Sequence, residues 1–220
     1  MRTLKPKHIA LLLGLFIAAL VITGGLLSTL PVETTVRASA YSDSDFDPED
    51  NLLINWCFCD GSYFQDGIPQ LVVPDGWYLT YLDGEPFEGI GDGAAYRPEA
   101  VTVDYYTVSP EDQLEFFEID GETHRYVLKV FKGHAPVYAH LWQDYTLVPG
   151  QRYTLQAFVY PDFVESYDNG KQFSADPWAG EVYLGTNAAG QWFAPGHGTL
   201  DYGRCNLLTY EFVATVADTT

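Results

Sequence analysis

The stretch that decides the fold is Tyr138–Tyr160, which reads YAHLWQDYTLVPGQRYTLQAFVY. Apolar and polar residues alternate in both halves of this stretch, and a period of two residues is that of a β-strand. The letters VPGQ at 148–151 place Pro and Gly where a tight reversal of the chain needs them. The stretch therefore predicts two consecutive strands, Val137–Thr146 and Arg152–Tyr160, joined by a turn.

The same alternation assigns the faces of these two strands. The predicted core face of the second strand carries Tyr153, Leu155, Ala157 and Val159. Its opposite face, and the corresponding face of the first strand, mix aromatic rings with hydrogen-bonding groups. Such faces are candidates for ligand binding, and their residues are Tyr138, His140, Trp142, Gln156, Phe158 and Tyr160.

Short runs of the same kind fill the rest of the chain from residue 51 onward, separated by Gly, Pro and Asp. The further predicted strands are Leu52–Phe58, Trp77–Leu82, Ala100–Tyr106, Gln113–Ile119, Arg125–Phe131, Gly180–Gly185 and Leu207–Val216. Many short strands without helical periodicity or an internal repeat predict one all-β domain, residues 51–220, built as a sandwich of two sheets.

Four segments of this domain carry a recognisable pattern: NLLINWCF at Asn51–Phe58, VPDGW at Val73–Trp77, YVLKVF at Tyr126–Phe131 and LTYEFVA at Leu208–Ala214. They resemble the corresponding segments of jelly-roll carbohydrate-binding modules of the galactose-binding-like type. The order and spacing of Ala139–Tyr160 are also similar to the middle of such modules. The resemblance covers roughly the whole of 51–220. It implies a jelly roll of two antiparallel sheets that binds sugar without catalysis.

The three cysteines are Cys57, Cys59 and Cys205. Two cysteines one residue apart on a strand are poorly disposed to bond each other, so a disulfide from Cys205 to either Cys57 or Cys59 is expected. The resemblance implies the same pairing, because the first and last strands of a jelly roll are antiparallel neighbours. Which of the two bonds to Cys205 stays open.

The net charge excludes one class of function. The chain of 220 residues has 11 Lys and Arg against 30 Asp and Glu, a net charge of −19. Only one of the acidic residues but four of the basic ones precede Tyr41, so residues 41–220 carry 7 basic against 29 acidic groups, or −22. Nucleic acid is therefore excluded as a partner, because phosphate binding needs clustered Lys and Arg.

The first 40 residues predict export. Residues Ile9–Leu30 are 22 uncharged positions behind the basic MRTLKPKH, long enough for a hydrophobic helix that crosses a membrane. Ala38-Ser39-Ala40 is also a site that a signal peptidase could cut. A cleaved signal peptide and an uncleaved anchor both stay open. Either one predicts a protein that is secreted or held at the outer face of the cytoplasmic membrane, with residues 41–50 as an acidic linker.

Other aromatic residues lie close to predicted loops: Trp77, Tyr78, Trp178 and Trp192. Trp77 directly follows Pro-Asp-Gly and is expected to plug the core. Trp178 and Trp192 lie in Gly- and Pro-rich segments, which suit either a binding loop or a lid over the sandwich edge. We add these two to the candidate ligand-binding residues.

No catalytic motif accompanies these residues. The sequence has no G-x-S-x-G, H-E-x-x-H or phosphate-binding loop, and a surplus of carboxylates is not evidence of a glycosidase pair. The expected function is therefore non-catalytic binding of carbohydrate or cell-surface glycan. The alternative is a cell-surface structural or adhesion module that binds protein subunits and has no sugar site. No cofactor is expected, although a structural calcium ion fits so acidic a sandwich.

Overall fold

The computed structural model describes residues 12–24, 51–87, 93–110, 118–119, 122–123, 125–187, 191–196, 198–215 and 218–219, and in this part the protein is all-β. The longer strands are β1 (Leu12–Gly24), β5 (Glu99–Asp104), β8 (Tyr126–Lys132), β11 (Arg152–Ser166) and β15 (Asn206–Val213). The shorter strands are β2 (Ser62–Phe64), β3 (Val72–Pro74), β4 (Tyr78–Tyr81), β6 (Glu118–Ile119), β7 (Glu122–Thr123), β9 (Ala139–Trp142), β10 (Tyr145–Thr146), β12 (Gln172–Phe173), β13 (Leu184–Thr186), β14 (Gln191–Phe193) and β16 (Asp218–Thr219). Two single-turn 3₁₀ helices, η3 (Gln65–Gly67) and η4 (Tyr105–Thr107), complete the described elements.

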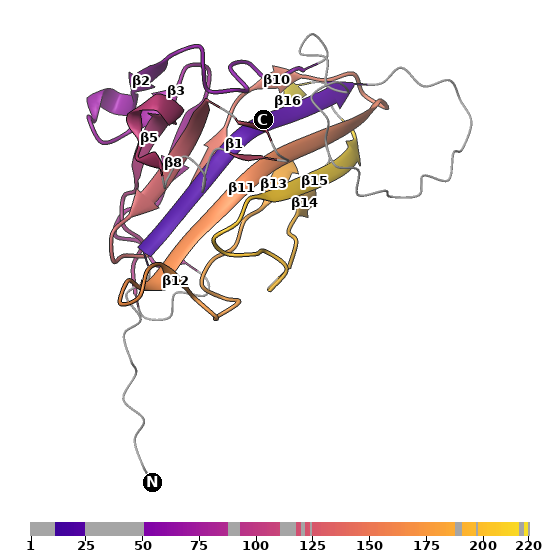
Figure 1. Ribbon diagram of the computed structural model, residues 1–220. Helices are drawn as coiled ribbons and strands as arrows, with labels where there is room; N and C mark the ends of the chain where they lie inside the picture. Colours follow the sequence, from indigo (N-terminus) through magenta and orange to yellow (C-terminus); the bar gives the residue numbers. More distant parts are fainter. Residues whose placement is uncertain are drawn as a thin grey trace.

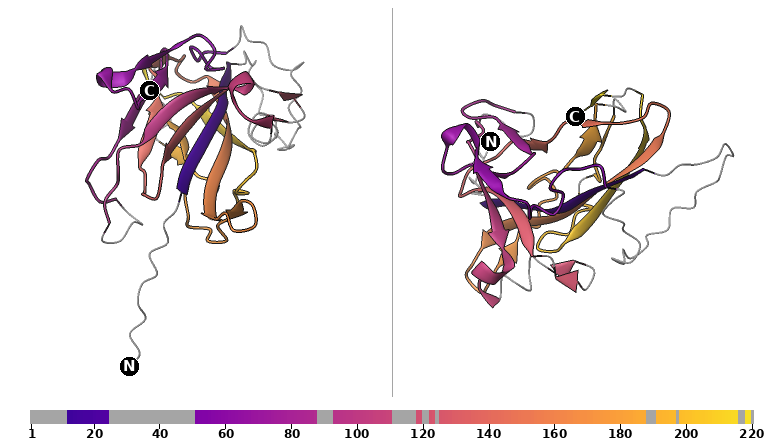
Figure 2. Two further views of the ribbon diagram at one scale, coloured as in Figure 1. Left: turned by 60° about the vertical axis from the view of Figure 1, so that its left-hand side comes forward. Right: turned by 90° about the horizontal axis from the view of Figure 1, so that it is seen from above.

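The main sheet has six strands and is organised around β11. Its strand order is β12-β11-β1-β8-β5, and β15 pairs with the first half of β11. Every pairing is antiparallel. In Figure 1, β1 (indigo) runs beside β11 (orange) along their whole length, and the two turned views in Figure 2 keep these strands side by side.

The N-terminal hydrophobic helix that the sequence predicts is not confirmed, because the structure describes Leu12–Gly24 as strand β1. This strand lies between β8 and β11, with Leu12 opposite Val164 and Gly24 opposite Tyr153. An uncharged apolar run is typical of a central strand of a sheet as well as of a membrane helix. No helix among the described residues is long and apolar enough to span a membrane. The predicted linker 41–50 lies outside the described residues.

The core lies between the main sheet and several two-stranded sheets. The predicted core face of β11 is confirmed, since Tyr153, Leu155, Ala157 and Val159 are all buried in one cluster. Strands β3, β4 and β13 pack against the same cluster, with Val73, Leu79 and Leu184 buried in it. Burying these side chains is the main source of stability in such a fold.

The sheet of β4 and β9 covers part of this core and presents its other face outward. Leu79 and Leu141 are paired in register and point inward, and the neighbouring pairs are Tyr78 with Trp142 and Thr80 with His140. Because alternate residues of a strand point to opposite faces, these two pairs lie on the outward face.

The first predicted strand, Leu52–Phe58, is wrong over its whole length, and so is the disulfide predicted from it. Residues 53–58 form turns, with positive φ at Asn55 (49°) and Phe58 (57°). The turns bring the Cα atoms of Cys57 and Cys59 to 5.2 Å, and these two residues form the disulfide. Cys205 is not part of this bond; it lies beside β15, half-buried against a different cluster.

The other predicted strands differ mainly in their ends. Val137–Thr146 is divided into β9 and β10, and Arg152–Tyr160 is extended to Ser166. In place of the predicted strand Gly180–Gly185, the structure has the shorter strand β13 at Leu184–Thr186. Most of the predicted strand Gln113–Ile119 falls outside the described residues.

Candidate functional site

The candidate site is a row of aromatic rings on the outward face of β4 and β9. We call it the aromatic strip, and it consists of Tyr78, Phe87, Tyr138, His140, Trp142 and Trp192. Tyr78, Tyr138 and Trp192 are 48%, 40% and 59% exposed. Rings with this much exposure contribute little to the core, so the strip is available to a ligand.

Ring contacts join the members of the strip in two groups, one of Tyr78 and Trp142 and one of the other four rings. Tyr78 stacks on Trp142 with centroids 4.9 Å apart and ring planes at 26°. The His140 ring lies 5.0 Å from that of Tyr138 and 6.4 Å from that of Trp192. At the far end, Phe87 lies 5.3 Å from Tyr138. Because these distances are typical of favourable ring pairs, each ring limits the movement of the next.

Trp192 reaches the strip from the hairpin of β13 and β14. It is paired in register with Gly185. A Cβ atom at Gly185 would overlap the indole carbons of Trp192, so the indole lies flat against the bare glycine backbone. The absence of a side chain at position 185 is therefore what sets the orientation of Trp192.

Two contacts hold this hairpin on the rest of the fold. The Tyr145 hydroxyl donates to Thr186 Oγ1 at 2.9 Å, and burial raises the pKa of Tyr145, although this hydrogen bond acts in the opposite direction. Phe193 stacks on Tyr210 of β15 with centroids 6.2 Å apart. The exposed ring of Trp192 thus stands on a hairpin that two contacts fix to the rest of the fold.

Polar groups accompany the rings. Thr80 lies directly opposite His140 on the same face, and Asp144 follows Trp142 by two residues; both are exposed. The tyrosine hydroxyls, the imidazole and the indole N–H of Trp192 add donors and acceptors. Flat apolar faces beside hydrogen-bonding groups can bind a molecule that itself has an apolar face and a polar rim.

The structure does not bring together all the predicted ligand-binding residues. It places Tyr138, His140, Trp142 and Trp192 in one strip. The predictions for Phe158 and Tyr160 are wrong, since these residues are only 6% and 2% exposed.

The reason is that the second face of β11 is covered. Phe158 and Tyr160 form a small cluster with Val127, and partly buried residues pack against them: Val103, Tyr105, Val108, Cys205 and Leu207. Gln156 lies on that face too, half-buried, and its amide donates to Thr209 Oγ1 of β15 at 3.2 Å. None of the three belongs to the strip.

Two tryptophans outside the strip, Trp178 and Trp77, differ in exposure. Trp178 is 68% exposed on a separate turn, where its backbone N–H donates to Asp176 Oδ1. The prediction that Trp77 plugs the core is confirmed, because it is 2% exposed and its indole N–H donates to the carbonyl of Asn55 at 3.2 Å.

Two members of the strip are not among the ligand-binding residues predicted from the sequence. Tyr78 is predicted to lie near a loop, with no pairing to Trp142, and Phe87 is not singled out. The alternation of Tyr78 and Thr80 around Leu79 is the signal that indicates an outward Tyr78. Nothing local to Phe87 predicts its contact with Tyr138, which joins residues 51 positions apart.

Among the described residues, one group of side chains has the donor atoms and spacing for a metal ion, namely Cys57, Cys59 and Asp60. Its two sulfur atoms are bonded to each other, and calcium prefers oxygen ligands, so this group does not bear on the expected calcium ion. The calcium ion stays a prediction.

No family model, no curated protein and no solved structure matches the chain. The resemblance to galactose-binding-like modules therefore stands on its motifs alone.

Proposed function

We propose that this protein binds carbohydrate without catalysis through the aromatic strip. The observation that carries the proposal is the chain of ring contacts from Phe87 to Trp192, which draws together strands β9 and β14 and the segments that follow β4 and precede β9. A sugar ring presents C–H patches that stack on aromatic faces and hydroxyls that need hydrogen-bond partners. Thr80, His140 and Asp144 supply such partners beside the rings.

We further propose that the sandwich is a jelly roll, as the resemblance implies. Support comes from the antiparallel pairing throughout the sheets and from a core packed between the main sheet and smaller ones. The first segment, Asn51–Phe58, departs from that pattern because it turns rather than pairing as a full strand.

We propose that the protein acts outside the cytoplasm. The supporting features are the uncharged run Ile9–Leu30 with its basic flank and the disulfide of Cys57 with Cys59, a bond that persists in oxidising compartments. Sequencing the N-terminus of exported protein decides between the routes. A mature chain that begins at Tyr41 would lack β1, so β8 and β11 would need another partner, whereas a chain that retains residues 12–24 keeps that strand.

A glycan array probed with the full chain tests the sugar site. We expect binding to at least one glycan, and we expect Trp192→Ala to weaken it by about tenfold or more, which is roughly 1.4 kcal/mol or above. Sedimentation of the same sample tests the alternative of a protein-binding module. Binding to no glycan, together with assembly into multimers, would contradict the proposal.

The matched control is Trp178→Ala, because Trp178 is as exposed as Trp192 but lies on another turn. Its glycan affinity should stay within about twofold of the unmodified chain, since small surface changes away from a site have small effects. If Trp178→Ala weakens binding and Trp192→Ala does not, the site lies elsewhere than the strip.

A further inference from the structure

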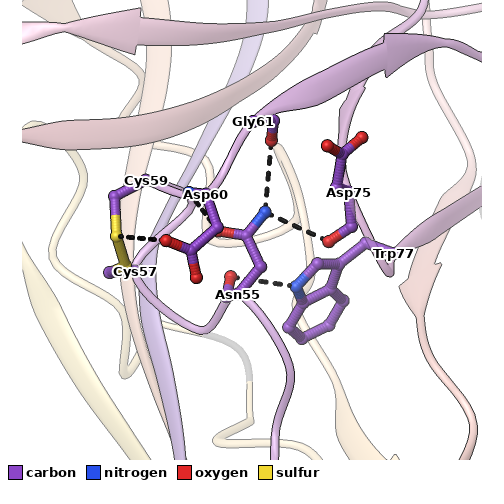
Figure 3. Close-up of a disulfide and its surroundings, with 7 residues drawn as sticks. All are labelled: Asn55, Cys57, Cys59, Asp60, Gly61, Asp75 and Trp77. Carbon is purple, nitrogen blue, oxygen red and sulfur yellow. Dashed lines mark hydrogen bonds between the residues drawn. A yellow bond between two sulfur atoms is a disulfide. The ribbon is translucent and has the colours of Figure 1, made fainter.

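The loop that carries the disulfide is held together mainly by the side chain of Asn55. This residue is 4% exposed, and its amide donates to the carbonyls of Gly61 (3.2 Å) and Asp75 (3.1 Å). Its Oδ1 accepts from the backbone N–H of Asp60 at 2.8 Å. Figure 3 shows Asn55 between these partners, with the disulfide on one side and Trp77 on the other.

A buried ring fixes the loop a second time. Phe58, the residue between the two cysteines, is 1% exposed and meets Trp77 edge to face with centroids 5.7 Å apart. The Phe58 N–H also donates to the carbonyl of Asn55 at 3.0 Å. The loop therefore has a core anchor and a hydrogen-bond framework that do not involve sulfur.

The disulfide adds little to this framework. Cys57 and Cys59 are separated by two positions, and closing so small a ring removes little conformational freedom from the unfolded chain. A bond from either cysteine to Cys205 would instead have closed a loop of most of the domain. The loss of the present bond should therefore leave the fold in place.

The bond is open to attack from solvent. Cys59 is exposed and Cys57 half-buried, so an incoming thiolate can reach Cys59 Sγ. Asp60 Oδ1 lies 3.7 Å from that sulfur. A disulfide sulfur has no proton to donate, so this contact becomes a hydrogen bond only after reduction, when the Cys59 thiol faces the carboxylate. The carboxylate thus favours the reduced form.

From these observations we propose that Cys57–Cys59 is a redox-active disulfide that oxidises peptide or protein dithiols. Exposed disulfides that the fold does not need are the labile ones, whereas buried structural ones resist reduction. This activity is independent of the sugar site, because none of its residues belongs to the aromatic strip.

The exchange transfers two electrons. A thiolate of the dithiol attacks Cys59 Sγ and forms a mixed disulfide, while the bond to Cys57 breaks and its electron pair leaves on Cys57 Sγ, which takes up a proton. The second thiolate of the dithiol then displaces Cys59 Sγ, which takes up the other proton. The dithiol loses two electrons and two protons and becomes a disulfide, and Cys57 and Cys59 become thiols.

The test incubates the full chain with a reduced peptide that contains two cysteines, with a chelator present so that trace metal cannot trap thiols. Alkylation and peptide mapping then report each cysteine separately, including Cys205. We expect about one peptide disulfide for each chain, with Cys57 and Cys59 becoming alkylated and near-ultraviolet circular dichroism unchanged. Two results would overturn the proposal. In one, the peptide reduces the disulfide only after the chain is denatured; in the other, reduction abolishes the near-ultraviolet circular dichroism.

Asp60→Asn keeps the shape of the side chain and removes its charge. We expect its redox equilibrium in a glutathione buffer to move toward the disulfide by roughly two- to fivefold, the usual range for one exposed charge. Asp66→Asn, an exposed aspartate on η3, is the matched control and should not move it. If the two variants have the same redox equilibrium, Asp60 does not belong to the proposed redox site. The redox proposal and the sugar-binding proposal can fail separately, because neither result changes the outcome of the glycan array.

Discussion

The outward face of β9 and the second face of β11 read almost alike in sequence, yet one meets solvent and the other is buried. Each carries aromatic rings mixed with hydrogen-bonding groups. Strand β9 has four residues in a two-stranded sheet, and only its inner face is packed. Strand β11 has 15 residues within a six-stranded sheet, and residues 157–164 are buried on both faces.

A two-residue period therefore indicates which residues share a face of a strand, but it does not indicate which other segment covers that face. The cover over Phe158 and Tyr160 comes from η4 and from the segment that enters β15, both distant in sequence. Three experiments sharpen the comparison.

The largest expected effect is on stability when each face is truncated. Phe158→Ala should lower the free energy of unfolding by about 3–5 kcal/mol, because it leaves a cavity in the cluster with Val127 and Tyr160. Tyr138→Ala, on the β9 face, should lower it by less than about 1 kcal/mol while weakening glycan binding. Denaturant unfolding curves measure both. Equal losses of stability would contradict the difference between the faces.

A smaller effect is expected from Gly185→Ala, which acts on the β9 face through Trp192. The added methyl group would displace the indole from the backbone it covers, so glycan affinity should fall by about three- to tenfold. Gly133→Ala is the matched control, because a Cβ there meets nothing within 4 Å. Unchanged affinity in Gly185→Ala would show that the orientation of Trp192 does not matter to binding.

The smallest effect concerns the support of the Trp192 hairpin at high pH. Burial raises the pKa of Tyr145 above its unfolded value of about 10, so folding favours the protonated hydroxyl. The stabilisation is fully present below pH 10 and is lost as the pH rises through the folded pKa. Tyr145→Phe removes this contribution and costs about 0.5–1.5 kcal/mol at neutral pH.

Melting curves between pH 8 and pH 11 check the last prediction. The difference in stability between the unmodified chain and Tyr145→Phe should shrink with rising pH. Using the difference cancels the other tyrosines with raised pKa values, which are Tyr63, Tyr202 and Tyr210. A constant difference would contradict the rise in the pKa of Tyr145 on burial.

Much of the strip could be predicted from the sequence because its signal is local. Tyr138, His140 and Trp142 recur with a period of two residues, which places them on one face of a strand. The buried position of Trp77, which lies outside the strip, also has a local signal, namely the turn that precedes it. The contact of His140 with Trp192 and that of Phe87 with Tyr138 could not be predicted, since each joins segments about 50 residues apart.

The disulfide shows the same limit. On the strand predicted from the sequence, a bond between Cys57 and Cys59 is unfavourable. The turn through Asn55 and Phe58 changes that geometry, and it exists because Asn55 finds partners at Gly61 and Asp75. No feature of the local sequence predicts that the Asn55 amide will bond to those two carbonyls.

The sequence alone was enough for the all-β class, the strongly negative net charge and the inward face of β11, because composition and a two-residue period encode them directly. Only the tertiary structure decided the place of Leu12–Gly24, the disulfide partners and which aromatic face stays exposed. These depend on which distant segment packs against each strand, and packing between distant segments leaves no local trace in the order of residues.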